Sequence, residues 1–366
     1  MNITDSFSPS YARARAKFLQ AATAVGARIQ SHLHPLAGRD GETLAMDLAL
    51  DGPADADRLL IVSSACHGAE GFCGSGVQVF ALRDAAWRAQ AAAAGVAVLY
   101  IHALNPYGFS HIRRVTHENV DINRNFQDFS QALPAKPAYA ELQALLLPEV
   151  WPPSAENQAA IDAQIERIGM KAFQAAVTSG QHEFPQGLFF GGTEPTWSNL
   201  TLRQVLRDYG SKASRIAWID LHTGLGPSGL GERICACRDD PVALARARAW
   251  WGSAGATPVT SIYDGTSSSA LLTGLMWNAI YEECPQAEYT GIALEYGTVP
   301  MERVIPALRA EQWLTLHPQA PQSQAQAIKQ ELLDVFYTDT DAWKTQIIEQ
   351  ARASLAQAVQ GLCAAS

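Results

Sequence analysis

The chain has 366 residues, of which 48% are hydrophobic and 17% charged, and its formal net charge is −9. This composition is typical of a globular protein and excludes disorder over most of the chain. Acidic residues outnumber basic ones, so no general positive field exists to bind phosphate backbones, and nucleic acid is not an expected partner. The length allows about two domains or one large α/β unit.

Nothing in the sequence predicts a membrane span or a secretory leader. No window has about 18 continuous apolar residues, and the first residues contain no apolar run. The cysteines lack the paired C-x-x-C spacing and are too sparse to staple a chain of this length. We therefore expect a cytoplasmic protein, without a membrane partner, whose thiols are reduced and mostly buried: Cys66, Cys73, Cys235, Cys237, Cys284 and Cys363.

The predicted elements alternate between helices and strands. Apolar residues at helical spacing predict an opening amphipathic helix over residues 11–32. Short runs of branched apolar residues predict strands at residues 58–64, 96–102, 215–222, 233–237 and 291–296. This alternation favours an α/β fold with three layers, in which helices cover both faces of a central mixed sheet.

Two segments differ from this pattern. Residues 128–185 are rich in Ala, Gln and Glu and contain several prolines, which predicts a helical insertion. After Pro321, helical patterns cover residues 322–336 and 341–362. We therefore expect one domain over residues 1–320 that includes the insertion, and a helical tail over residues 321–366 that packs on it.

Polar residues follow three of the predicted strands. His67 and Glu70 come after the first, His222 ends the third, and Glu295 lies in the fifth. Open α/β sheets bind ligands beyond the carboxyl ends of their strands, and two histidines with one carboxylate are the ligand set of a catalytic zinc. The sequence thus predicts one zinc ion on His67, Glu70 and His222, with Glu295 as general base. Asp220 shares a strand face with His222 and is expected to orient its imidazole.

Other patterns predict no second chemistry. Residues 224–229 fit the dinucleotide-binding pattern G-x-G-x-x-G, but a predicted strand follows them where that motif needs a helix. No G-x-S-x-G elbow stands between a strand and a helix. Cys66 adjoins His67, but neighbouring residues on a strand point to opposite faces, so we do not expect a thiol nucleophile.

The order and spacing of these residues resemble the M14 carboxypeptidase superfamily of zinc hydrolases and, within it, the DUF2817 group. The resemblance extends from about residue 55 to residue 310 and depends on five elements: His67-x-x-Glu70, Asn105-Pro-Tyr-Gly108, Asp121-Ile-Asn-Arg-Asn-Phe126, His222 and Glu295. It implies a carboxypeptidase-like fold, zinc ligation by the two histidines and Glu70, and Glu295 as the catalytic glutamate.

The same resemblance implies residues that recognise a substrate. Asn123 and Arg124 match the family's pair that binds a terminal carboxylate, a role suited to a bidentate guanidinium. The family has an arginine shortly upstream that stabilises the oxyanion. Arg113 and Arg114 are adjacent candidates for it, and we prefer Arg114. Trp197 belongs to residues 187–199, which resemble the DUF2817 group and suit a loop that covers a substrate.

These residues predict a zinc-dependent hydrolase that cleaves an amide bond in a small peptide or amino-acid derivative with a free carboxylate. Digestive-type carboxypeptidases carry a tyrosine in the loop before the catalytic glutamate, whereas residues 267–277 contain none. The motif Asp220-Leu-His-Thr223 resembles the desuccinylase and aspartoacylase branch, so a deacylase of N-acyl amino acids is the alternative. A ligand-binding protein without turnover is the alternative from another class. The sequence does not predict the oligomeric state.

Overall fold

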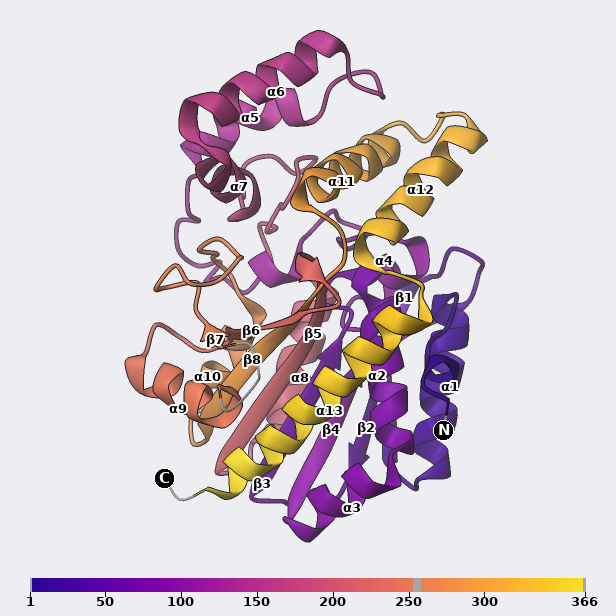
Figure 1. Ribbon diagram of the computed structural model, residues 1–366, viewed down its shortest axis with the longest axis vertical. Coiled ribbons are helices and arrows are strands. Elements are labelled where there is room, and N and C mark those ends of the chain that lie inside the picture. Colours follow the sequence, from indigo (N-terminus) through magenta and orange to yellow (C-terminus); the bar gives the residue numbers. More distant parts are fainter. Residues whose placement is uncertain (1, 253–257, 365–366) are drawn as a thin grey trace.

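A mixed eight-stranded sheet forms the centre of the computed structural model, which describes residues 2–252 and 258–364 (Figure 1). The strand order is β1-β2-β4-β3-β5-β8-β6-β7, and β4, β3, β5 and β8 are parallel neighbours. The strand bounds are β1 Arg28–Ala37, β2 Thr43–Asp51, β3 Arg58–Ser64, β4 Val96–His102, β5 Arg215–Ser228, β6 Gly231–Cys235, β7 Val259–Thr260 and β8 Glu288–Gly297. The five predicted strands are therefore confirmed; β5 and β8 are longer than predicted, and β6 begins and ends two residues earlier.

Helices cover both faces of this sheet, with α2 and α13 in front and α8 behind in Figure 1. The α/β fold with three layers is thus confirmed. The helices are α1 Tyr11–Ala24, α2 Gly71–Arg83, α3 Ala85–Ala93, α4 Pro106–His111, α5 Pro137–Leu146, α6 Ala155–Ile168, α7 Met170–Thr178, α8 Trp197–Gly210, α9 Pro241–Trp251, α10 Ala279–Glu283, α11 Met301–Leu316, α12 Gln322–Phe336 and α13 Asp341–Cys363. Short 3-10 turns are η1 Thr4–Ser6, η2 Gly68–Glu70, η3 Ile122–Arg124 and η4 Met276–Asn278.

The predicted opening helix is wrong in its second half. α1 ends at Ala24 because Gly26 adopts a left-handed conformation with φ of +73°, and Arg28–Ala37 forms the edge strand β1. Ile29 fits the helical period by chance, since it pairs with Ala49 of β2 and is exposed. The sequence also did not predict β2, whose Leu, Ala and Met residues are equally common in helices.

The two segments predicted to be helical, residues 128–185 and the part after Pro321, contain helices as expected. α5, α6 and α7 lie within residues 128–185, and α12 and α13 confirm the two predicted C-terminal helices. Side chains of α5 and α7 form an apolar cluster with α11 and α12, whereas α13 packs into the core around the sheet. Among the described residues, no helix is both long and apolar enough to cross a membrane. Five cysteines are buried and Cys363 is exposed, as predicted for unpaired thiols.

Candidate active site

Three neighbouring strands bring the predicted site residues to one edge of the sheet. β3, β5 and β8 run parallel, and their register places Ser63 beside Asp220 and His222 beside Glu295. His67 lies three residues after the end of β3 and is the N-cap of the η2 turn that contains Glu70. The carboxyl ends of these strands therefore form the floor of one pocket, as parallel strands of an open sheet do.

The turn that carries His67 and Glu70 is fixed by a close backbone approach. A Cβ atom at Gly68 would lie 2.0 Å from the backbone carbon of Gly108, so only glycine fits there. Asn105 caps α4 by accepting a 2.8 Å hydrogen bond from the Gly108 N–H. Its side-chain amide also donates to the carbonyl of Arg114. The Asn105-Pro-Tyr-Gly108 motif thus positions the metal-ligand turn and Arg114 together.

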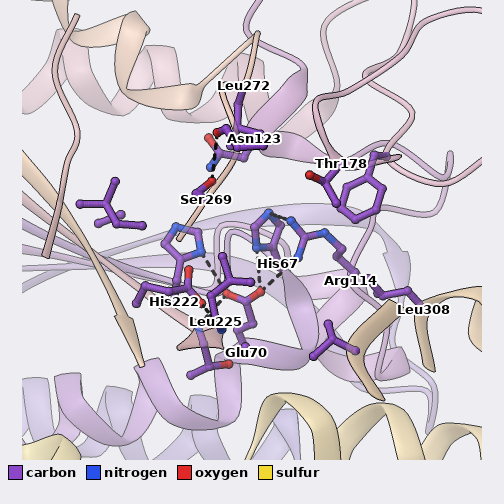
Figure 2. Close-up of a pocket in the computed structure, with 18 of the residues that line it drawn as sticks. His67, Glu70, Arg114, Asn123, Thr178, His222, Leu225, Ser269, Leu272 and Leu308 are labelled. Atoms are coloured by element: carbon purple, nitrogen blue, oxygen red, sulfur yellow. Dashed lines mark hydrogen bonds and ion pairs between the residues drawn. The ribbon is translucent and has the colours of Figure 1, made fainter. Parts of the chain in front are cut away.

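The candidate metal ligands converge on one point (Figure 2). Nδ1 of His67 lies 2.8 Å from Oε1 of Glu70, and Nδ1 of His222 lies 3.0 Å from Oε2 of the same carboxylate. One ligand atom from each residue lies within 4.8 Å of the other two, and all three residues are buried. Two imidazole nitrogens and one carboxylate oxygen at this separation fit a zinc ion with an open fourth position.

A carboxylate lies behind each imidazole. Nε2 of His222 is hydrogen-bonded to Asp220, which also accepts a 2.5 Å hydrogen bond from the Ser63 hydroxyl. Nε2 of His67 lies 3.3 Å from Oδ1 of Asp121. The Asp220 carboxylate orients the ring of His222 and leaves its Nδ1 facing Glu70. Nε2 of His67 also accepts a 2.8 Å hydrogen bond from Nη2 of Arg114.

Asp121 is a site residue whose role the sequence did not reveal. Its carboxylate accepts a 3.0 Å hydrogen bond from Nε of Arg114 and another of 3.0 Å from the backbone N–H of Asn123. The available signal was its place two residues before Asn123, which is typical of a cap on a short turn. One buried carboxylate therefore links His67, Arg114 and the η3 turn.

Neighbouring positive groups keep two buried carboxylates of the cluster ionised. Burial disfavours the charged form of Glu70, yet His67 and His222 hold the pKa of its carboxyl below the usual value. Burial likewise opposes ionisation of Asp121, but Arg114 and Arg124 keep its pKa well below the usual value. Both carboxylates are thus ionised at neutral pH.

Glu295 has a different environment from Glu70. Its Oε1 accepts a 3.1 Å hydrogen bond from the backbone N–H of Leu225, and the residue is 8% exposed. Burial, together with the negative charge of Glu70, raises the pKa of the Glu295 carboxyl to about 8. A carboxylate with this pKa can accept and return a proton near neutral pH.

Asn123 and Arg124 lie on the wall of the same pocket. The side-chain oxygen of Asn123 accepts a hydrogen bond from the Met276 N–H. The Arg124 guanidinium donates to the backbone oxygens of Thr178 and Asn123, at 2.7 to 3.0 Å, and forms no ion pair with any carboxylate of the described residues. Burial lowers the pKa of Arg124. Within the described ranges, this buried cation therefore has no carboxylate partner of its own at the pocket wall.

The structure separates the two adjacent arginines. Arg114 lines the pocket, and its Nη1 lies 3.4 Å from Oε1 of Glu70. Arg113 points away to α11, where its guanidinium lies 2.9 Å from Glu311 and donates to Gln312. Trp197 also lies outside the pocket lining, as the first residue of α8, with its ring 4.8 Å from that of His34.

Cys66 lies closer to the cluster than strand alternation predicts. Its sulfur is within 4.8 Å of ligand atoms of Asp220 and His222, because Ala65 has a left-handed φ of +56° that interrupts the alternation. Burial, with the nearby Asp220 charge, raises the pKa of the Cys66 thiol. The thiol therefore stays protonated and is no nucleophile.

Apolar side chains form most of the remaining pocket wall. One side comes from the segment before β8 and the other from α11, while α7 contributes polar Gln174 and Thr178. No tyrosine lines the pocket in the part of the chain that the structure describes. The apolar residues are Phe189, Leu225, Ile234, Ile262, Ala270, Leu272, Trp277, Ala293, Met301, Val304, Ile305, Leu308 and Phe336.

Solved structures are similar to this chain at low sequence identity, and the first two below share its fold. Thrombin-activatable fibrinolysis inhibitor is similar over 97% of this chain and 74% of that chain, with a TM-score of 0.54 and 10% identity. The bovine inhibitor in complex with tick carboxypeptidase inhibitor matches over 97% of both chains, with a TM-score of 0.51 and 8% identity. Carboxypeptidase A from Helicoverpa armigera covers 90% of this chain and 74% of its own, at a TM-score of 0.45 and 11% identity.

The fold is therefore an α/β fold of the carboxypeptidase-like kind. The chain belongs to the DUF2817 family, whose model is described as a protein of unknown function and matches residues 7–350. The family resemblance predicted from the sequence is thereby confirmed. A search of curated proteins gives no match.

Proposed function

We propose that this protein is a zinc-dependent hydrolase that cleaves an amide bond in a small peptide or amino-acid derivative with a free carboxylate. The observation that carries the proposal is the convergence of His67, Glu70 and His222 in the same pocket as the unpaired guanidinium of Arg124. One feature fits a metal and the other fits an anionic ligand.

The residues of the pocket divide the reaction among them. Arg124 binds the substrate carboxylate, and Asn123 lies beside it. Zinc, when bound, supplies a Lewis acid that polarises the scissile carbonyl and makes water more acidic. Glu295 takes the proton of the attacking water and returns it to the leaving amine. Arg114 stabilises the negative charge that develops on the carbonyl oxygen.

Matched substrates test this proposal. The zinc-loaded protein is expected to hydrolyse benzoyl-glycyl-phenylalanine and to be at least about a hundredfold slower with the corresponding C-terminal amide, because the amide cannot pair with Arg124. Glu295→Gln is expected to abolish turnover while zinc is retained. Equal rates on the acid and the amide would contradict a role for the free carboxylate.

The same assay separates the alternatives. Preferential hydrolysis of N-acetyl-phenylalanine over the dipeptide derivative would identify a deacylase of N-acyl amino acids, which the absence of a tyrosine from the described pocket lining favours. Binding of these compounds by the wild type without any turnover would identify a ligand-binding protein on the same scaffold. A cytoplasmic location stays a prediction.

A further inference from the structure

The aromatic ring of Phe189 lies beside both arginines of the pocket. The guanidinium carbons of Arg114 and Arg124 are 5.1 and 5.7 Å from the centre of this ring. Phe189 is 6% exposed and lines the pocket. A guanidinium within about 6 Å of a ring centre is attracted to it electrostatically, so one ring interacts with both cations.

The loop of residues 187–196 holds Phe189 in an unusual backbone conformation. Its φ is +52°, which is costly for a large aromatic residue and persists only where the surroundings impose it. The Phe189 carbonyl accepts a 3.2 Å hydrogen bond from Gln181, and the next carbonyl, of Phe190, accepts one of 2.8 Å from the N–H of Asp121. The loop is thereby tied to the segment that carries Asn123 and Arg124.

The two arginines differ in their other partners. Arg114 is paired with Asp121 and Glu70, whereas the described partners of Arg124 are backbone carbonyls and the ring. Two neighbouring guanidinium groups repel each other, and the negative face of a ring reduces this cost without neutralising either charge. Arg124 thus stays available to an anionic ligand, while Arg114 is held beside it by Asp121 and Glu70.

We propose that Phe189 is a positioning residue, which fixes Arg114 and Arg124 relative to each other. A substrate anchored by its carboxylate at Arg124 then presents its carbonyl oxygen to Arg114. This inference rests on the proposed function for its catalytic consequence, but the placement of the two arginines can be tested without turnover.

The test compares three variants. Phe189→Leu keeps an apolar side chain but removes the ring, Phe189→Tyr keeps the ring, and Phe190→Leu removes a ring of equal size and similar burial from the same loop. No guanidinium lies over the Phe190 ring within the described ranges. With benzoyl-glycyl-phenylalanine, we expect Phe189→Leu to raise KM and lower kcat, with a loss of about tenfold in kcat/KM. We expect Phe189→Tyr and Phe190→Leu to stay within about twofold of the wild type.

A second readout is independent of catalysis. Phenylglyoxal modifies accessible guanidinium groups, and mass spectrometry gives the rate at each arginine. We expect Phe189→Leu to accelerate modification of Arg114 and Arg124 but not of Arg113, whose guanidinium contacts Glu311 and Gln312 of α11. Phe190→Leu should leave all three rates unchanged.

Each outcome decides the inference separately from the proposed function. Unchanged modification rates in Phe189→Leu would overturn it, whether or not the protein hydrolyses amides. Faster modification of Arg113 as well, or equal losses in Phe189→Leu and Phe190→Leu with a lower melting temperature, would show a merely structural role and also overturn it. Selective acceleration at Arg114 and Arg124 in a protein without turnover would support the placement and contradict only the proposed function.

Discussion

Arg124 is held by Thr178, the last residue of α7. Nε and Nη2 of the guanidinium donate hydrogen bonds of 3.0 and 2.7 Å to the one Thr178 carbonyl oxygen. The final carbonyls of a helix carry the negative end of its dipole, so this contact stabilises the cation without an acidic side chain. The helical insertion therefore contributes directly to the candidate anion-binding group.

Gly180→Ala tests this contact. A Cβ atom at Gly180 would lie 2.6 Å from Cδ of Arg124, and the side chain cannot move without losing its bonds to Thr178. We expect an increase of about tenfold in KM for substrates with a free carboxylate, equivalent to about 1.4 kcal/mol, and a much smaller change in kcat. Steady-state kinetics on benzoyl-glycyl-phenylalanine measure both values.

Gly169→Ala is the matched control. Gly169 has a similar left-handed φ, +83° against +96°, but a Cβ atom there would meet nothing within 4 Å. Both variants should lose about 1 kcal/mol of unfolding free energy from backbone strain, because an alanine is strained in this region. If Gly169→Ala raised KM as much as Gly180→Ala, the effect would come from strain and not from Arg124.

Substitution of the two adjacent arginines is expected to affect different properties, activity for Arg114 and stability for Arg113. Arg114→Lys removes the fork that faces the pocket and should lower kcat by about a hundredfold or more while zinc is retained. Arg113→Lys changes a buried contact with Glu311 and Gln312, so it should lower the melting temperature and leave kcat within about twofold. Kinetics and thermal unfolding on both proteins would reject the assignment if the phenotypes were reversed.

Asp220→Asn is expected to weaken zinc binding. The substitution removes the negative charge behind His222 while it keeps the shape of the side chain, and such outer partners are worth about 10–100-fold in metal affinity. Competition with a chromophoric chelator measures the zinc Kd. Asp128→Asn, at an exposed position, is the control and should leave the Kd unchanged. An unaltered Kd in Asp220→Asn would show that Asp220 does not support the metal.

The burial of His102 predicts that the folded protein loses stability as the pH falls. It is fully buried beneath Phe18, with Nε2 2.9 Å from the Ser75 hydroxyl, and burial lowers its pKa to about 4. In the unfolded chain the imidazole has a pKa of about 6.5, so the unfolded state binds the proton first as the pH falls. The neutral, buried His102 therefore contributes to the free energy of unfolding. This contribution is fully present above pH 6.5, and about 3 kcal/mol of it is lost between pH 6.5 and pH 4.

Denaturant unfolding at a series of pH values measures this contribution. His102→Gln should be less stable than the wild type at pH 8 but should show a flatter decline towards pH 4. His117→Gln, which changes an exposed histidine, should keep the wild-type decline. Parallel pH profiles for wild type and His102→Gln would contradict the assignment of the proton uptake to His102.

The sequence predicted the site residues that lie on one short turn or at a recognisable place in a strand. His67 and Glu70 share one turn, and His222 and Glu295 follow from their strands, so the parallel order of β3, β5 and β8 was enough to bring them together. The choice of Arg114 over Arg113 agrees with its position in the pocket. Sequence spacing alone could not distinguish Arg113 from Arg114, because two adjacent residues differ mainly in the direction in which their side chains point.

What the sequence could not predict depends on distant contacts. Thr178 is 54 residues from Arg124 along the chain, and Phe189 has no local signal that distinguishes it from Phe190. The edge strand β1 was missed because its outer side chains are exposed, so it has no buried apolar run, and the helical period extends across Gly26 into it. Tertiary contacts override local periodicity at these positions.

The zinc content of the purified protein tests the central claim most directly. The wild type, purified without chelator and dialysed at pH 7.5, should hold about one equivalent of zinc, because three converging ligands form a complete protein donor set. His67→Ala should lose nearly all of it, whereas His117→Ala, at an exposed histidine, should not. Less than about a third of an equivalent in the wild type, or equal zinc in wild type and His67→Ala, would contradict the metal site.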